Sequence, residues 1–177
     1  MSDSTVSSFK SRQHYRVRKL LSEQHKKSPT EEAHMKVLFV CYGNINRSQI
    51  AEAIFNKVSK KNRSISAGVK PRKLGIFVKA EHNNPFIPLR IEGYDISKAK
   101  IKRLNRRMVN SSDKIVLIMG RRNLKDVPPY VRDRPDLEFW EVGSISDEAP
   151  FVEYCKLERE RIKQIERLVK DLVRRIE

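Results

Sequence analysis

Residues 35–49 read MKVLFVCYGNINRSQ. The first six residues, Met35–Val40, have the length and β-branched content of a buried parallel strand. Over residues 48–60 the apolar residues recur at helical spacing, at Ile50, Ala51, Ile54 and Val58. A tight loop therefore connects the end of a strand to the start of a helix, with Cys41 at the strand end and Arg47 at the helix start.

A loop of this kind is suited to binding an anion. Free N–H groups at a helix N-terminus and successive loop amides attract phosphate oxygens, and the same surroundings favour a thiolate over a thiol. Cys41 is therefore a candidate nucleophile, and the guanidinium of Arg47 can hold two phosphoryl oxygens at once. Ser48 can donate a hydrogen bond to the thiolate. We expect Gly43 to supply a positive φ, and Asn44 to tolerate the left-handed region and tie the loop to itself.

The segment Cys41–Ser48, preceded by Val-Leu-Phe-Val and followed by Ala51-Glu52, resembles the active-site loop of the low-molecular-weight protein tyrosine phosphatases. The resemblance continues outside the loop. It extends to the second strand, a short helix end, the third strand, and a last strand followed by a long C-terminal helix, at residues 66–69, 93–96, 112–119 and 137–142. It covers residues 35–177.

The alternation of strands and helices indicates an α/β fold, a doubly wound parallel sheet with helices on both faces. The resemblance implies four strands in the order 2-1-3-4. Ligands bind such sheets outside the carboxyl ends of the strands, where Cys41 is expected. Short helices are predicted around residues 86–92 and 101–109. The terminal helix is predicted to pack an apolar stripe on the sheet, made of Ile165, Leu168, Val169, Leu172, Val173 and Ile176.

The resemblance also implies a mechanism through a cysteinyl-phosphate, without metal or cofactor. Cys41 would be the nucleophile, Arg47 would hold the phosphoryl group, and an aspartate on the loop at residues 143–151 would be the general acid. Asp147 is the only aspartate of that loop and Glu148 is its alternative, although alignment on the family's Asp-Pro pair would place Ala149 at the acid position. The phosphate-binding residues would be Tyr42, Gly43, Asn44, Ile45, Asn46, Arg47 and Ser48.

Two departures from the family pattern have consequences for the loop. The family commonly has a second cysteine before the arginine, where this chain has Asn46, so oxidised Cys41 would lack a disulfide partner within the loop. The family also often has a histidine in the segment matching residues 95–104, and none occurs here. The loop must therefore be held by other groups, and Ser66 with Asn44 is the predicted replacement.

The substrate implied by the resemblance is a phosphorylated protein or a small aryl phosphate, with inorganic phosphate or sulfate as loop ligands. Family members with isoleucine at the position of Ile45 prefer phosphotyrosine-like esters, whereas phosphoarginine phosphatases carry threonine. Tyr42, with Phe151 or Tyr154, could form the walls of a slot for a flat ring. The alternative reading of these aromatic residues is that they belong to the core.

The composition limits the protein class. The 177 residues, 38% of them hydrophobic, suit one domain at residues 35–177 behind a polar, basic extension at residues 1–34, which is either flexible or partly helical. No apolar run approaches the ~18 residues of a membrane span, and the extension lacks the apolar core of a secretory signal. Two cysteines, one of them needed as a thiolate, suit a reducing cytoplasm.

The net charge of +16 suits anionic substrates, and it leaves nucleic acid as a possible partner that we do not favour, because no recognisable binding module is present.

Two alternatives to a phosphatase remain. One is a phosphate-loop protein that has lost catalysis and binds phosphorylated or nucleic-acid partners through its basic surface. The other is a thiol-dependent arsenate reductase, which needs resolving cysteines after the third strand, whereas Cys155 lies on the C-terminal helix.

Overall fold

The computed structural model describes residues 34–76, 93, 94, 96, 98–146 and 149–177. The helices and strands described below all lie in the unit His34–Glu177. The predicted extension, apart from His34, and the predicted helix at residues 86–92 lie outside the described residues. Both therefore stay predictions.

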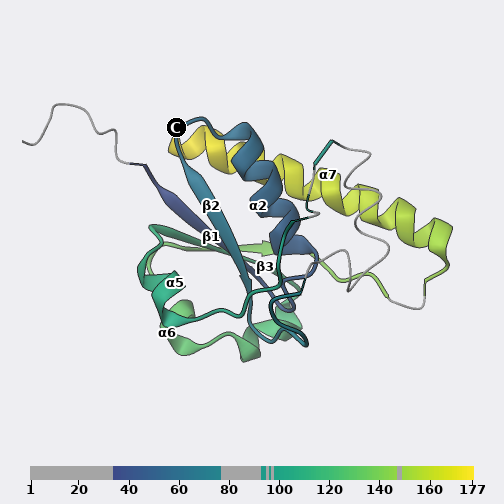
Figure 1. Ribbon diagram of the computed structural model, residues 1–177, viewed down its shortest axis with the longest axis horizontal. Coiled ribbons are helices and arrows are strands. Elements are labelled where there is room, and N and C mark those ends of the chain that lie inside the picture. Colours follow the sequence, from purple (N-terminus) through teal and green to yellow (C-terminus); the bar gives the residue numbers. More distant parts are fainter. Residues whose placement is uncertain (1–33, 77–92, 95, 97, 147–148) are drawn as a thin grey trace, which may run out of the picture. The chain divides into compact units, whose positions relative to one another are not determined.

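A four-stranded parallel sheet forms the centre of this unit (Figure 1). Its strands are β1 (Lys36–Cys41), β2 (Arg63–Gly68), β3 (Lys114–Met119) and β4 (Leu137–Glu141). The order β2-β1-β3-β4 confirms the predicted doubly wound sheet. The two inner strands, β1 and β3, are almost wholly buried, which explains why their sequences KVLFVC and KIVLIM are nearly continuous apolar runs.

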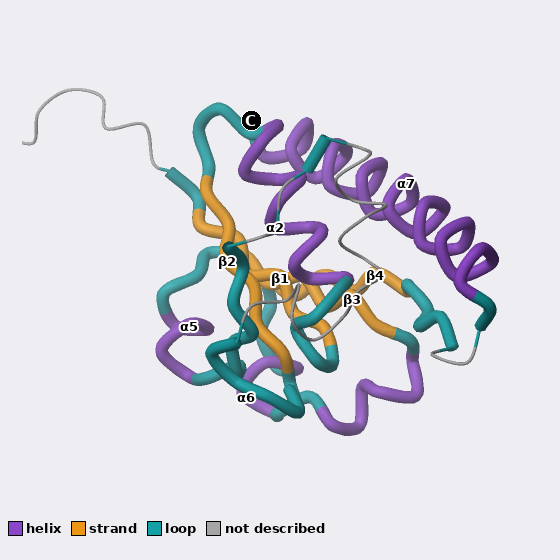
Figure 2. Tube along the Cα trace, turned by 45° about the vertical axis from the view of Figure 1, so that its right-hand side comes forward, coloured by secondary structure: helices purple, strands orange, loops and turns teal. Residues whose placement is uncertain are grey.

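Helices cover both faces of the sheet, as Figures 1 and 2 show. The long helices α2 (Arg47–Val58) and α7 (Phe151–Ile176) share one hydrophobic cluster with the sheet. The short helices α5 (Arg106–Asn110) and α6 (Pro129–Arg132) share a second cluster. A 3-10 helix, η1 (Arg121–Asp126), follows β3. The sequence predicts neither η1 nor α6, because each is too short to show an apolar period.

The apolar stripe predicted for α7 is confirmed. Ile165, Val169 and Leu172 are completely buried, and the other three predicted positions are partly buried against the same cluster. The ring of Phe39 in β1 lies 5.7 Å from that of Phe55 and 5.8 Å from that of Trp140. These aromatic contacts join the strand that ends in Cys41 to α2 and to β4, so the strand's position is fixed by the core.

The prediction of a helix over residues 101–109 is wrong in its first half. The chain at residues 101–105 is extended and runs beside Gly68, where the Gly68 N–H donates to the Lys102 carbonyl at 2.8 Å and the Leu104 N–H donates to the Gly68 carbonyl at 2.8 Å. Helix α5 begins only after Asn105, whose side chain accepts a hydrogen bond from the Met108 N–H. Pairing with the end of β2 therefore overrides the helical period.

The far end of α7 is tied to the sheet by an ion-pair cluster around Glu138. Its carboxylate contacts Arg175 at 2.7 Å and Lys114 at 3.0 Å. Burial alone would raise the pKa of Glu138, but hydrogen bonds from Arg175 and Trp140 and the charge of Lys114 lower it to about 2. The cluster therefore contributes to stability while Glu138 is ionised.

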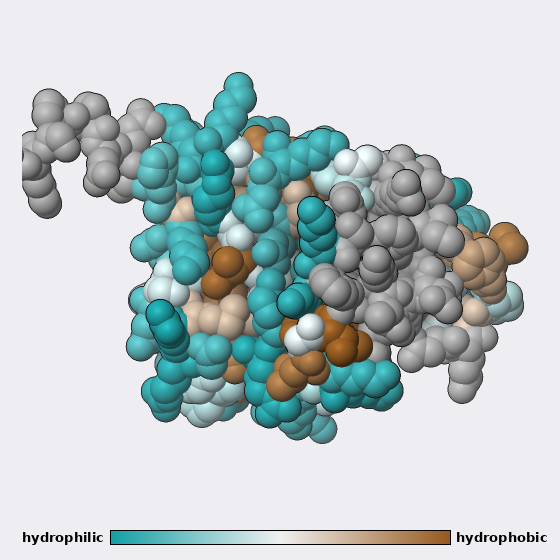
Figure 3. Space-filling model, viewed as in Figure 1, coloured by the Kyte–Doolittle hydropathy of each residue, from teal (hydrophilic) through white to brown (hydrophobic). Residues whose placement is uncertain are grey.

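The described surface is largely polar. The face shown in Figure 3 is mostly hydrophilic, with small apolar areas. Leu74, Phe151 and Val152 are the large hydrophobic side chains that are exposed among the described residues. Within the described part of the chain, no helix has the length and apolar character needed to cross a bilayer.

Candidate active site

The loop at residues 42–46 lies at the carboxyl edge of the sheet, between the end of β1 at Cys41 and the start of α2 at Arg47. Strand β1 has neighbours on both sides, and Cys41 is in register with Gly68 of β2. The side chain of Asn46 does not cap α2, so the first N–H groups of the helix are open to an anion. The predicted arrangement of strand, tight loop and helix is confirmed.

The sulfur of Cys41 is held by two hydrogen-bond partners from its own loop and helix. The side chain is 2% exposed. Its Sγ accepts a hydrogen bond from the backbone N–H of Asn44 at 3.2 Å and lies 3.0 Å from the Ser48 hydroxyl oxygen. The sulfur therefore faces the loop and the first turn of α2, where a nucleophile would be expected.

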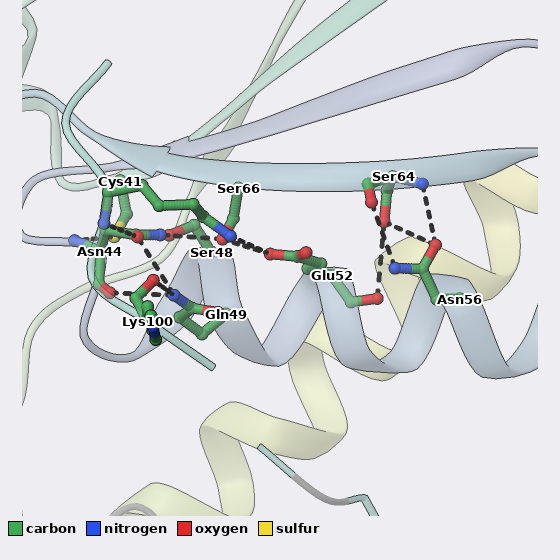
Figure 4. Close-up of polar contacts among 10 residues, drawn as sticks. Cys41, Asn44, Ser48, Gln49, Glu52, Asn56, Ser64, Ser66 and Lys100 are labelled. Atoms are coloured by element: carbon green, nitrogen blue, oxygen red, sulfur yellow. Dashed lines mark hydrogen bonds and ion pairs between the residues drawn. The ribbon is translucent and has the colours of Figure 1, made fainter. Parts of the chain in front are cut away.

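The Ser48 hydroxyl that contacts Cys41 is also bound by the side chain of Asn44 (Figure 4). The Asn44 Oδ1 atom accepts the backbone N–H of Lys102 at 2.7 Å, so Nδ2 is the donor side of the amide. Asn44 Nδ2 donates to Ser48 Oγ at 3.0 Å. Ser48 Oγ accepts from Asn44 and keeps its own proton, so it is able to donate to the Cys41 sulfur, the role predicted for it from the sequence.

The same amide group fastens the loop to β2. Its Nδ2 atom also donates to Ser66 Oγ at 2.8 Å, and Ser66 in turn donates to the carboxylate of Glu52. Lys102 Nζ pairs with that carboxylate at 3.2 Å. The predicted contact between Ser66 and Asn44 is confirmed, and it is one link in a chain of donors and acceptors that ends in an ion pair.

Gln49 adds a second attachment that the sequence analysis does not include. Its Nε2 atom lies 3.1 Å from Asn44 Oδ1 and 3.3 Å from the Asn44 backbone oxygen, and it donates to the Lys100 carbonyl at 3.0 Å. Gln49 is 1% exposed. The loop is therefore bound to the extended segment at residues 100–105, the part of the chain for which a helix was predicted.

The backbone requirements of the loop differ from those predicted. Asn44 adopts a positive φ of 53°, as expected. Among the described glycines, positive φ occurs at Gly75 and Gly93, so the prediction that Gly43 supplies one is wrong. The glycine that the site requires is Gly68, because a Cβ atom there would lie 2.8 Å from both the Asn44 nitrogen and the Gly43 carbonyl carbon.

The guanidinium of Arg47 is held in place from the sheet. Arg47 is 8% exposed, and its Nη1 atom donates to the carbonyl of Val142, just after β4, at 2.9 Å. The side chain also lines the same cavity as Cys41. One edge of the guanidinium is thus anchored to the protein, and its remaining N–H groups can serve a bound anion.

A cavity of about 680 Å³ brings the site residues together. The predicted nucleophile Cys41 lines it, and so do five of the predicted phosphate-binding residues, namely Tyr42, Gly43, Ile45, Asn46 and Arg47. The other two predicted phosphate-binding residues, Asn44 and Ser48, are completely buried and contact the Cys41 sulfur rather than lining the cavity. The remaining lining residues are Lys70, Arg72, Arg122, Asn123, Ser144, Ile145, Ser146, Tyr154 and Arg161.

The sequence profile of low molecular weight phosphotyrosine protein phosphatases matches residues 36–138, more than half of the chain. The chain belongs to this family. A comparison with curated protein sequences finds no significant match.

Three solved structures illustrate the likeness to this phosphatase family. A low molecular weight protein tyrosine phosphatase from T. tengcongensis is 26% identical, with a TM-score of 0.61, and the match covers 80% of this chain and 99% of that one. An arsenate reductase from Archaeoglobus fulgidus is 28% identical, with a TM-score of 0.55 and coverage of 77% and 98%. Vibrio vulnificus Wzb, solved in complex with benzylphosphonate, is 15% identical, with a TM-score of 0.67 and coverage of 81% and 99%, which shows the fold alone.

The loop in which the family's general acid is expected reaches the cavity. Ser144, Ile145 and Ser146, which follow β4, are among its lining residues. Asp147 and Glu148, the two candidate acids, come directly after them but lie outside the described residues. Their assignment therefore stays a prediction.

An ion pair at the start of α7 is the main feature of this phosphatase-family site that the sequence analysis misses. Glu158 is completely buried, and its Oε2 atom lies 3.0 Å from Arg161 Nη2. Arg161 is 7% exposed and lines the cavity. The sequence does contain a sign of this pair. The buried positions of α7 at residues 165, 169 and 172 are preceded, at the same helical spacing, by buried residues 154, 158, 161 and 162. Charged residues at core-facing positions are a sign of function.

Burial dominates the electrostatics of this pair. Burial raises the pKa of Glu158. The positive charge of Arg161 and a hydrogen bond with the Asn46 side chain act in the opposite direction and lower it, but burial has the larger effect. Burial lowers the pKa of Arg161, while the carboxylate of Glu158 opposes that change. An arginine remains charged in any protein environment, so the cavity holds a second guanidinium beside Arg47.

Proposed function

We propose that the protein hydrolyses phosphomonoesters with Cys41 as the nucleophile. The observation that supports this best is the surroundings of the Cys41 sulfur. The Asn44 N–H donates to it, the Ser48 hydroxyl lies at hydrogen-bond distance from it, and it shares a cavity with the anchored guanidinium of Arg47. A sulfur with these neighbours is placed to meet phosphorus next to an oxyanion site.

The proposed reaction has two steps. In the first, the Cys41 sulfur forms a bond to phosphorus while the bond to the leaving oxygen breaks, and that oxygen takes a proton from Asp147. In the second, a water oxygen bonds to phosphorus, the bond between sulfur and phosphorus breaks, and the water proton passes to Asp147. Arg47 and the N–H groups of the loop hold the non-bridging oxygens throughout.

Aryl phosphates, including phosphotyrosine in proteins, are the proposed substrates. Ile45, Tyr42 and Tyr154 all line the cavity, which supports a slot for a flat ring. Phe151 is 55% exposed and is not among the lining residues, so Tyr154 is the better supported of the two predicted wall residues.

Hydrolysis of an aryl phosphate by the full chain, compared with the Cys41→Ser variant, tests the proposal. We expect turnover in the wild-type protein and its loss in the variant. Salt-sensitive binding without turnover in both proteins would instead support the alternative of a catalytically inactive phosphate-loop protein that binds phosphorylated or nucleic-acid partners.

The general acid is tested by comparing Asp147→Ala with Glu148→Ala. We expect Asp147→Ala to slow hydrolysis of esters with poor leaving groups by about 10²–10⁴-fold and to affect activated aryl esters less. If only Glu148→Ala slows the reaction, the acid is Glu148.

Arsenate reduction has less support, although an arsenate reductase is among the similar structures. A thiol-dependent reductase needs a second cysteine that can reach the first. The chain has two cysteines, and Cys155 is not among the residues that line the cavity with Cys41.

A further inference from the structure

The cavity is lined by more cationic side chains than one phosphate group requires. Arg47, the loop amides and the start of α2 already provide an oxyanion site for a phosphoryl group. Four more cationic side chains line the same cavity, namely Lys70, Arg72, Arg122 and Arg161. Among its described lining residues there is no carboxylate.

These four cations are not equivalent. Lys70 Nζ pairs with the carboxylate of Asp126, which raises the pKa of Lys70 and offsets its charge. Arg161 is charged and 7% exposed, and its Nε atom has no hydrogen-bond partner among the described protein atoms. A buried guanidinium with an unused donor is costly unless it serves a ligand or a packing role.

Arg161 is also fixed in position. Its Nη2 atom is held at 3.0 Å by Glu158, which is completely buried behind it on α7. Arg122, by contrast, is exposed and comes from η1, and its Nη2 atom donates to Ser144 Oγ at 3.3 Å. Ser144, Arg122 and Arg161 all line the cavity, so one part of its described lining consists of Ser144, Tyr154 and Arg161, with Arg122 attached to it through Ser144.

We propose that this part of the cavity is a second anion subsite, and that the preferred substrate is a phosphomonoester carrying a second anionic group beside the scissile phosphate. This inference rests on the proposed function and narrows its substrate class. Arg161 is the principal ligand of the second group, and Arg122 adds charge from the rim. A planar guanidinium can bind a phosphate or a carboxylate through two parallel hydrogen bonds, so both anions belong to the class.

Binding to a Cys41→Ala protein tests the subsite without turnover. The ligands are phenyl phosphate, 3-carboxyphenyl phosphate and 3-phosphonophenyl phosphate, measured by calorimetry at low and at moderate salt. We expect the two doubly anionic ligands to bind at least about tenfold more tightly than phenyl phosphate at low salt, as a charge-assisted hydrogen bond would give. The comparison of the carboxylate with the phosphonate identifies the preferred second group. Equal affinity for all three ligands would overturn the inference.

Variants in the same background locate the subsite. Arg122→Ala should reduce the preference severalfold, whereas Arg121→Ala should leave it unchanged, because Arg121 pairs with Glu141 and does not line the cavity. The neutral pair Glu158→Gln/Arg161→Met should abolish the preference and keep the affinity for phenyl phosphate. It avoids leaving Glu158 buried without its partner. A preference that survives in this pair would contradict the assignment of Arg161.

Turnover of phenyl phosphate by the protein with Cys41 intact separates the two proposals. If the protein hydrolyses phenyl phosphate but the Cys41→Ala protein binds all three ligands equally, the result supports the phosphatase proposal and contradicts the second subsite. If there is no hydrolysis but the preference is present and depends on Arg161, the subsite stands and the catalytic proposal falls.

Discussion

Two parts of the protein line the same cavity and are built in opposite ways. The loop that holds Cys41 is fixed by the neutral side chains of Asn44, Ser48 and Ser66, whose amide and hydroxyl groups each have a partner and which meet a charged pair only at Glu52 and Lys102. Helix α7 instead holds a buried ion pair, Glu158 with Arg161, in which the Arg161 Nε atom lacks a hydrogen-bond partner among the described residues.

The difference indicates that these two parts have different roles. A satisfied neutral network fixes geometry at little electrostatic cost, which is what a nucleophile needs. A buried ion pair is weak evidence for stability, because the desolvation of two charges can exceed their attraction. The pair at the start of α7 is therefore better explained by what Arg161 offers to the cavity than by what it adds to folding.

Removing one partner of the ion pair should have the largest effect on stability. We expect Arg161→Met to destabilise the protein by about 3 to 5 kcal/mol at neutral pH, because Glu158 is left buried without an opposite charge. Denaturant unfolding measures the change. A matched control is Arg175→Met, which removes an exposed arginine from the Glu138 cluster on the same helix and should cost about 1 kcal/mol or less.

The effect of Arg161→Met should also depend on pH in a defined direction. The pKa of Glu158 is already raised in the folded protein, so the folded state binds its proton more tightly than the unfolded chain does. Stability therefore falls as the pH rises from the ordinary glutamate pKa of 4.5 towards the raised value, and the deficit of the variant should be smallest at low pH. A loss that is the same at all pH values, and equally large in Glu158→Gln/Arg161→Met, would point to packing rather than charge.

Asn44→Ala should break the neutral network and have the next largest effect. It removes the acceptor of the Lys102 N–H and the donor to the buried hydroxyls of Ser48 and Ser66. We expect a loss of about 2 to 4 kcal/mol, with no dependence on the titration of Glu158, and at least about a hundredfold loss of phosphatase activity. Asn105→Ala is the control, because it removes a helix cap distant from the sulfur and should cost about 1 kcal/mol without a change in activity.

Gly68→Ala should have a smaller effect that is confined to the loop. The new Cβ would meet backbone atoms of Gly43 and Asn44 at 2.8 Å, so the loop must move away from β2. We expect a loss of about 1 to 3 kcal/mol together with reduced activity. Gly143→Ala serves as the control, since nothing lies within 4 Å of its added Cβ. Equal behaviour of the two variants would mean that the close approach of β2 to the loop is unimportant.

The sequence predicts the neutral part of the cavity much better than the charged part. The order of strands and the place of Cys41 follow from apolar periods and from the family resemblance, and the contact between Asn44 and Ser66 was expected from the missing histidine. Sequence patterns predict local structure incorrectly where hydrogen bonds to a distant part of the chain determine the backbone conformation. Residues 101–105 are extended because they bond to Gly68, and Gly68 rather than Gly43 is the glycine that the loop requires.

The role of Arg161 could not be predicted by counting charges, because a lysine- and arginine-rich helix is normally solvated on its charged face. Only the register of α7 against the core shows that Glu158 and Arg161 continue the buried stripe. The pair could have been identified from the sequence by asking which charged residues fall at the helical positions of the apolar stripe, because Glu158 and Arg161 do.

Trapping of the covalent intermediate tests the central claim that the Cys41 sulfur attacks phosphorus. The wild-type protein is mixed with excess aryl phosphate, quenched in acid during turnover, and digested for mass spectrometry. We expect one phosphoryl group on the peptide that contains Cys41, absent from the Cys41→Ala protein. A phosphoryl group on another side chain, or turnover that persists in the Cys41→Ala protein, would contradict the claim.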